Sequence, residues 1–241
     1  MSSASSISGT AKRFYKHAAV EEIAGGHTVT LDGRAVKTPA KQPLVIAVRE
    51  LAEAVAAEWR AQEEEIRQET MPMMRFVCTS LDRVTPQRAA VVAETAKYGE
   101  TDLLCYRAEE PAELTRRQTE VWQPLLDWAA ARYGAKLAVT DGVTAIEQDA
   151  AAVARLADAV ANENDLTLTG LHFTTAATGS LIVALALLER EIDAEHAWSA
   201  SHIDEQWQLE RWGADEELEQ RLAGMRGEIA AAGEFLALSR Y

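Results

Sequence analysis

The sequence predicts an α+β fold, with a small antiparallel β-rich N-terminal domain followed by a larger α-helical domain. Residues 27–31 alternate apolar and polar side chains, and Asp32-Gly33 is a pair typical of a tight hairpin turn. From residue 49 onward, apolar residues recur at helical spacing. Because strands come first and helices follow, the order favours α+β over alternating βαβ units.

Changes in composition and in apolar pattern along the chain predict three regions. We expect a disordered tail over residues 1–12, which are Ser-rich and contain no acid. A β-rich domain ending in a helix is expected over 13–66, and a helical domain over 67–241. The chain has 241 residues, of which 48% are hydrophobic, so it can form one core or two small cores.

Several segments before residue 49 are candidates for strands. The hairpin is expected within 27–39, and Pro43 suits the first position of a strand over 43–48. A further strand is a candidate within 18–26.

Capping residues and breakers predict the helices that follow. Thr85 is expected to cap a helix that has Pro86 in its first position, while Asp193 and Asp215 are expected to cap two later helices and Gly134 to stop one. The expected helices are 49–66, 71–84, 85–98, 111–133, 148–162, one within 166–192, 193–213 and 215–238. Residues 101–107 form a short apolar element that could be either a helix or a strand, and 137–142 are a candidate strand.

Composition narrows the classes of partner. A net charge of −14 repels phosphate backbones, so nucleic acid is not an expected partner; the acidity could equally serve solubility alone. The longest apolar run, 181–188, is far shorter than a membrane span, so no membrane insertion is expected. Cys78 and Cys105 lie in apolar segments without metal-ligand spacing, which indicates buried, reduced thiols in a soluble intracellular protein.

The motifs of common catalytic sites do not occur in the sequence. It contains no Gly-Lys pair and therefore no phosphate-binding loop, and no zinc-protease, nucleophile-elbow, dinucleotide or EF-hand motif. We therefore expect no cofactor, no metal site and no catalytic residue. His172 is interpreted as a structural histidine at the edge of an apolar helix.

The stretch SHIDEQWQLERWG, residues 201–213, mixes carboxylates with indoles. On a continuous helix over 193–212, one stripe carries the predicted partner-binding residues, with Asp204 at its edge. These residues are Trp198, His202, Asp204, Glu205, Leu209 and Trp212. A carboxylate among indoles must be paired, protonated or exposed in a groove. Glu205 could thus pair with an arginine inside the fold, or await a partner's cation in an open groove.

Six collinear stretches between residues 13 and 220 resemble the assembly chaperone family of the mitochondrial and α-proteobacterial ATP synthase catalytic head. They are RAVKTPAKQPL, AAEWRAQEEEI, MRFVCTSLDRV, GETDLLCYRAEEP, WQPLLDWAAARYG and DEQWQLERWG. The resemblance implies a non-enzymatic protein that binds the unassembled α subunit and shields the surface that later meets the β subunit. It also implies a functional acidic residue that lands on Glu205, with Asp204 as the neighbouring possibility.

Two further expectations accompany the resemblance. The chain has only about a dozen polar residues where mitochondrial relatives carry a targeting extension, so we expect a bacterial cytoplasmic protein, with eukaryotic relatives in the mitochondrial matrix. We also expect a monomer. The alternative function is a hydrolytic enzyme that uses Glu205 and His202 as acid and base.

Overall fold

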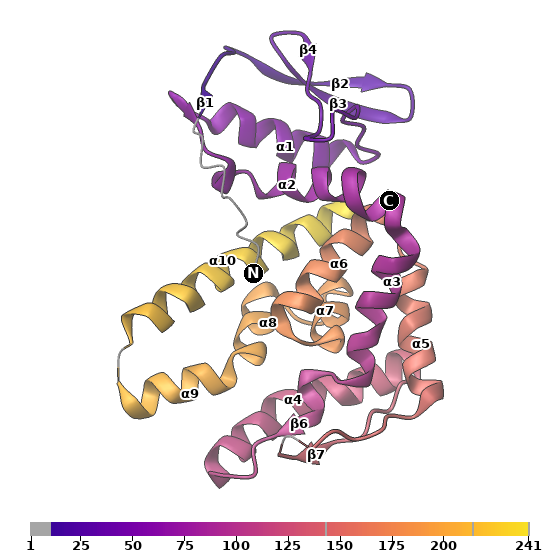
Figure 1. The fold of residues 1–241 in the computed structure, drawn as a ribbon, viewed down its shortest axis with the longest axis vertical. Helices are drawn as coiled ribbons and strands as arrows, with labels where there is room; N and C mark the ends of the chain where they lie inside the picture. The colour runs from indigo at the N-terminus through magenta and orange to yellow at the C-terminus, as the bar shows by residue number, and fades with distance from the viewer. Residues whose placement is uncertain (1–10, 143, 214, 241) are drawn as a thin grey trace, which may run out of the picture. The chain divides into compact units, whose positions relative to one another are not determined.

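The computed structural model describes residues 11–142, 144–213 and 215–240, and these form two compact units (Figure 1). The first unit ends at Asp82, and the second covers Arg83–Arg240. The predicted division between residues 66 and 67 lies inside the first unit, because the helix after it packs on the helix before it. Of the predicted tail, residues 1–10 lie outside the described residues, whereas Ala11–Lys12 form strand β1.

The two units differ strongly in charge. Residues 1–82 contain 10 Lys and Arg against 11 Asp and Glu, whereas residues 83–241 contain 14 against 27. Almost all of the net negative charge therefore belongs to the second unit.

The predicted hairpin is confirmed in the first unit. Strands β2 (Ala18–Ile23), β3 (Gly26–Leu31) and β4 (Arg34–Ala35) form an antiparallel sheet in that order. Asp32 and Gly33 both have positive φ, 49° and 77°, as a tight turn between twisted strands requires. The predicted strand over 43–48 is wrong: only isolated bridges form, at Pro43 and Ile46. Ile46 nevertheless exchanges two backbone hydrogen bonds with His27, both 2.8 Å long.

The first unit also contains two α-helices. Helix α1 (Arg49–Ala61) buries Leu51 and Val55, and α2 (Pro72–Thr79) packs against it. Glu58 of α1 accepts hydrogen bonds from the first amides of α2, from Met73 at 2.6 Å and Met74 at 2.8 Å, which satisfies donors that a helix start leaves free. The remaining elements of this unit are β5 (Glu65–Ile66), which pairs with β1, and the short helix η1 (Gln68–Thr70).

The second unit consists mostly of helices, as predicted. In chain order, its elements and the short helix that leads into it are η2 (Ser80–Val84), η3 (Thr85–Gln87), α3 (Arg88–Ala96), η4 (Lys97–Glu100), η5 (Leu103–Cys105), β6 (Tyr106–Arg107), α4 (Ala112–Tyr133), β7 (Thr140–Asp141), α5 (Ala150–Ala161), α6 (Asp165–Thr178), α7 (Leu181–Leu188), α8 (Ala194–Ser201), α9 (Ile203–Trp212) and α10 (Glu216–Ser239). Within the described ranges, no helix combines the length and apolar character needed to cross a membrane.

Several predicted helix ends are confirmed and one is wrong. Asp193 accepts from the His196 amide and Asp215 from the Leu218 amide, as N-caps do, and Gly134 ends α4 with a φ of 67°. Thr85 does not cap α3, which begins at Arg88. Its hydroxyl instead donates to Asp165 at the start of α6, 2.8 Å away.

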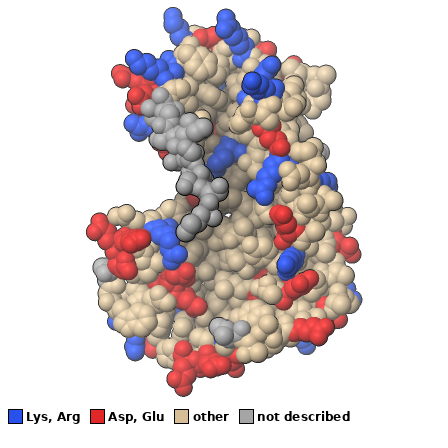
Figure 2. All heavy atoms as spheres, in the orientation of Figure 1, with Lys and Arg blue, Asp and Glu red and all other residues tan. Residues whose placement is uncertain are grey.

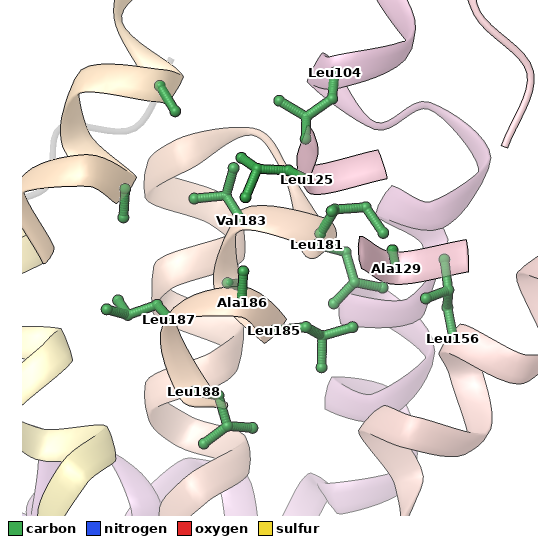
Figure 3. Close-up of a cluster of buried hydrophobic side chains, with 14 of the residues drawn as sticks. Leu104, Leu125, Ala129, Leu156, Leu181, Val183, Leu185, Ala186, Leu187 and Leu188 are labelled. Carbon is green, nitrogen blue, oxygen red and sulfur yellow. The ribbon is translucent and has the colours of Figure 1, made fainter. Parts of the chain in front are cut away.

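Helix α7 lies at the centre of the second unit. All eight of its residues are buried, as expected for a helix that is apolar on every side. Figure 3 shows its leucines among Leu125 and Ala129 of α4 and Leu156 of α5. Helix α7 packs against both α4 and α8, and these two helices position the candidate site.

A buried carboxylate holds the start of α7. Asp102 is fully buried and accepts hydrogen bonds from Ser180 Oγ at 2.7 Å, Ile182 N at 3.0 Å and Leu104 N at 3.1 Å. Burial raises the pKa of Asp102 to about 6, while these hydrogen bonds oppose the shift. Asp102 thus caps the short helix η5 and also holds the first turn of α7. Arg107, five residues further on, donates to Thr119 and Gln123.

The close approach of α6 and α10 depends on Gly170. A Cβ at this position would lie 2.7 Å from Leu236 Cδ2 and 2.9 Å from its Cγ. We expect Gly170→Ala to lower the free energy of unfolding by about 1–2 kcal/mol, since overpacking outweighs the gain in helix propensity. Urea denaturation measures the change. Gly224→Ala in α10 is the control, because nothing lies within 4 Å of its Cβ, and it should raise stability by up to about 1 kcal/mol. Equal effects at both positions would contradict the packing argument.

Candidate binding site between helices α8, α9 and α10

The predicted continuous helix over 193–213 is interrupted at His202. This residue has φ −124° and ψ 30°, and it separates α8 from α9. Its Nδ1 lies 3.0 Å from the carbonyl oxygen of Trp198, and its ring stacks on the Trp198 indole at 6.0 Å. In a regular helix that carbonyl would accept from the backbone amide of residue 202. The stacked, buried imidazole takes this place and ends α8.

The interruption changes which side chains lie together. Ile203 and Trp207 of α9, which are not part of the predicted stripe, are buried. Trp212 is 80% exposed at the end of α9, and Leu209 is half-buried. The interruption thus separates Trp198 and His202 from the predicted stripe, whereas Glu205, Leu209 and Trp212 remain on one face of α9.

The structure gathers only two of the predicted site residues at one pocket. Asp204 and Glu205 line it, whereas Trp198 and His202 stack on each other, and Leu209 and Trp212 follow on α9 outside the pocket lining. The pocket has a volume of about 370 Å³, and its lining consists of Leu103, Trp122, Ser201, Ile203, Asp204, Glu205, Gln208 and Arg221. Trp122 and Ile203 are buried and Leu103 is half-buried, so these apolar residues form the floor of the pocket. Asp204 and Arg221 are exposed and Glu205 is half-buried, so these charged residues form its mouth.

Helix α4 fixes this pocket from one side. Trp122 is buried in its wall, and its Nε1 donates to the Ala200 carbonyl at 2.7 Å, which holds the last turn of α8. One turn earlier, Gln118 donates to Asp204 Oδ1 at 2.7 Å. The Gln118 amide is itself oriented, because its oxygen accepts from the Ala108 amide at 2.8 Å. Arg117 and Glu210 add an ion pair of 2.7 Å between α4 and α9.

The two carboxylates have different environments. Asp204 has part of its surface exposed, yet the surrounding protein limits the hydration of its carboxyl and raises its pKa; the Gln118 hydrogen bond opposes this shift and the Glu205 charge reinforces it. The Glu205 side chain is 31% exposed, and its Oε1 lies 3.8 Å from Arg221 Nη2 of α10. Asp204, which the projection placed on the rim, thus lines the same pocket as Glu205.

Sequence reasoning missed Gln118, Trp122 and Arg221. Gln118 and Trp122 stand four residues apart on one helix, a spacing that places them on one face, and this was the available signal. Nothing in the local pattern indicated that Arg221 would face α9, because that contact depends on how two helices cross.

The pocket does not bring together the two residues of the alternative hydrolytic function. Glu205 lines the pocket, whereas His202 is buried against Trp198 and is not part of the lining. Nδ1 of His202 lies 3.0 Å from the Trp198 carbonyl oxygen and 2.9 Å from Ser201 Oγ. Ser201 also lies 2.8 Å from the Ala197 carbonyl, as expected for a hydroxyl that ends a helix. In the described part of the chain, no group of three or more His, Cys, Asp or Glu side chains suits a metal ion.

Acidic side chains continue from the pocket to the next helix. The first turns of α10 carry Glu216, Glu217 and Glu219, all exposed, and Figure 2 shows acidic atoms gathered over this end of the second unit. These acids thus precede Arg221 of the pocket lining on the same helix.

Comparisons with known proteins agree on one family. A family model described as ATP12 chaperone protein matches residues 12–130. Protein atp12, mitochondrial, of Schizosaccharomyces pombe is 25% identical over 218 residues, covering 86% of this chain and 75% of that protein. The crystal structure of Atp12 from Paracoccus denitrificans is 41% identical with a TM-score of 0.92, covering 95% of this chain and 99% of that one. The crystal structure of a protein from Agrobacterium tumefaciens is 40% identical in sequence with a TM-score of 0.92, covering 96% of this chain and 87% of that one.

Proposed function

Because this chain belongs to the ATP12 chaperone family, we propose that it acts in assembly of the ATP synthase catalytic head by binding the unassembled α subunit. In this proposal it covers the surface of α that later meets the β subunit. A free subunit with such a surface exposed tends to self-associate. A soluble, strongly acidic holder would keep the subunit available for assembly.

The observation that carries the proposal is the open pocket with Asp204 and Glu205 at its mouth. The fold holds Asp204 through Gln118, while the nearest cation to Glu205 is loosely placed and mostly exposed. Carboxylates held in this way suit a cation presented by another protein. Trp212, exposed on the same helix, adds an aromatic side chain of the type enriched at binding hot spots.

Co-expression with the α subunit tests the proposal. We expect soluble α to rise and to co-purify with the chaperone, and we expect added β subunit to displace the chaperone, because both cover the same surface. Soluble α can be measured by sedimentation and the complex by size-exclusion chromatography. If the chaperone neither binds nor protects α, the proposal fails; if a ternary complex with β forms instead, the masking of the β interface is contradicted.

A further inference from the structure

Helix α10 contributes a cation to the pocket from a poorly packed segment. Among its first turns Leu222 is buried, whereas Arg221 is exposed and Gly224 and Gly227 have nothing within 4 Å of a Cβ. The Arg221 side chain is 64% exposed. This guanidinium therefore has room to leave its position without disturbing the core.

The Arg221–Glu205 contact differs from the other ion pairs of this region. Arg117–Glu210 and Arg226–Glu195 each have an N–O distance of 2.7 Å, within hydrogen-bonding range. Arg221 Nη2 and Glu205 Oε1 lie 3.8 Å apart, which is too far for a hydrogen bond. An exposed pair at this distance contributes little to stability, so its role is better sought in the pocket that it borders.

We infer that Arg221 is a built-in competitor that neutralises Glu205 in the free protein and gives way to an arginine side chain of the client. The identity of the client as the α subunit rests on the proposed function. The arginine chemistry rests on the pocket alone. Its floor of Leu103, Trp122 and Ile203 fits an apolar stem, and two adjacent carboxylates fit the planar, multi-donor guanidinium group better than a point charge.

The competition has a physical consequence for the free chaperone. Without Arg221, two carboxylates on successive residues would face solvent beside an apolar floor, open to any cationic side chain. With Arg221 present, an incoming group must replace an existing charge interaction, so weak cations gain little. A guanidinium that forms hydrogen bonds with both carboxylates gains more than Arg221 gives up.

A small probe tests the pocket without the client. Nα-acetyl-arginine amide is titrated into ¹⁵N-labelled protein while the Trp122 indole and the Gln208 side-chain amide are followed by NMR. We expect weak binding to wild type, binding about two- to fivefold tighter in Arg221→Gln, the range that an exposed ion pair provides, and loss of binding in Glu205→Gln. Arg221→Lys keeps the charge and should resemble wild type. The corresponding lysine amide should bind less tightly than the arginine amide.

Several outcomes would overturn the inference. They are equal or weaker probe binding in Arg221→Gln, tighter binding in Arg221→Lys, or a gain from Arg221→Gln that persists in the Glu205→Gln background. Thermal unfolding of each variant confirms that it is folded.

The client supplies a second measurement. Arg221→Gln should tighten binding of the α subunit by a similar factor, and the double variant with Glu205→Gln should show no such gain. Unchanged or weaker α binding in Arg221→Gln contradicts the inference, because Arg221 would then be neutral or a direct contact. If the probe behaves as expected but wild-type protein does not bind α, the proposed function fails and the pocket chemistry stands.

Discussion

Glu205→Lys is expected to abolish capture of the ATP synthase α subunit while the chaperone stays folded. The Glu205 side chain is 31% exposed and lies at the pocket mouth, so a lysine can point into solvent without entering the core. The new ammonium would repel both Arg221 and the cation expected from the client. Removal of one partner from a charge pair that becomes desolvated at an interface costs about 3 kcal/mol or more, or at least a hundredfold in affinity.

Isothermal titration calorimetry with purified α subunit measures this effect. Glu234→Lys is the matched control, because Glu234 is an exposed acid on α10 outside the pocket lining and the substitution makes the same change in net charge. We expect the control to bind like wild type. If both variants lose affinity equally, overall charge rather than the pocket governs binding. If Glu205→Lys binds normally, Glu205 is not an anchor.

Asp102→Ala is expected to lower the free energy of unfolding by about 3 kcal/mol or more, because it leaves several buried donors without an acceptor. These are Ser180 Oγ and the amides of Ile182 and Leu104. The loss would loosen the start of α7, whose residues are all buried. Urea denaturation followed by circular dichroism measures the change. Asp158→Ala, at an exposed position on α5, should change stability far less; a similar loss there would contradict the role of the buried acceptor.

The same carboxyl predicts a dependence on pH. Burial raises the pKa of Asp102 to about 6 in the folded protein, from its ordinary value of 3.8. Between these values the folded state binds more protons than the unfolded state, so the contribution of this group to stability falls as pH rises. The advantage of wild type over Asp102→Asn should therefore shrink by about 2 kcal/mol between pH 4 and pH 7. An advantage that grows with pH would show that the site prefers the charged carboxylate.

Local signals in the sequence predicted the fold class and many element ends. The Asp32-Gly33 turn and the capping aspartates Asp193 and Asp215 depend on residues within a few positions, and so a single sequence carries them. The prediction of a strand over 43–48 was wrong: Leu44 and Ile46 are buried, but only Pro43 and Ile46 form isolated β-bridges. An apolar segment indicates burial, and it does not by itself indicate pairing with another strand.

At the candidate site, local sequence patterns no longer predict which side chains lie together. A helical projection assumes a uniform rotation per residue, and the interruption at His202 breaks that assumption. Two contacts stabilise the interruption: His202 stacks on Trp198, and Trp122 donates a hydrogen bond to the Ala200 carbonyl. Trp122 belongs to α4, which is far away in the sequence. Glu205 was identified by its residue type among indoles, whereas Gln118 contacts Asp204 from α4 and Arg221 lines the pocket from α10 only through tertiary packing.

The uneven distribution of charge between the two units has a kinetic consequence. Residues 83–241 carry 27 acids against 14 basic residues, while residues 1–82 are nearly balanced. A field of this kind acts before any contact forms, over a Debye length of roughly 10 Å at 0.1 M salt. It accelerates diffusional encounter with positively charged surfaces and slows encounter with acidic ones. The helical unit therefore meets positively charged proteins more often than acidic ones, before any side chain of a partner could reach the proposed pocket.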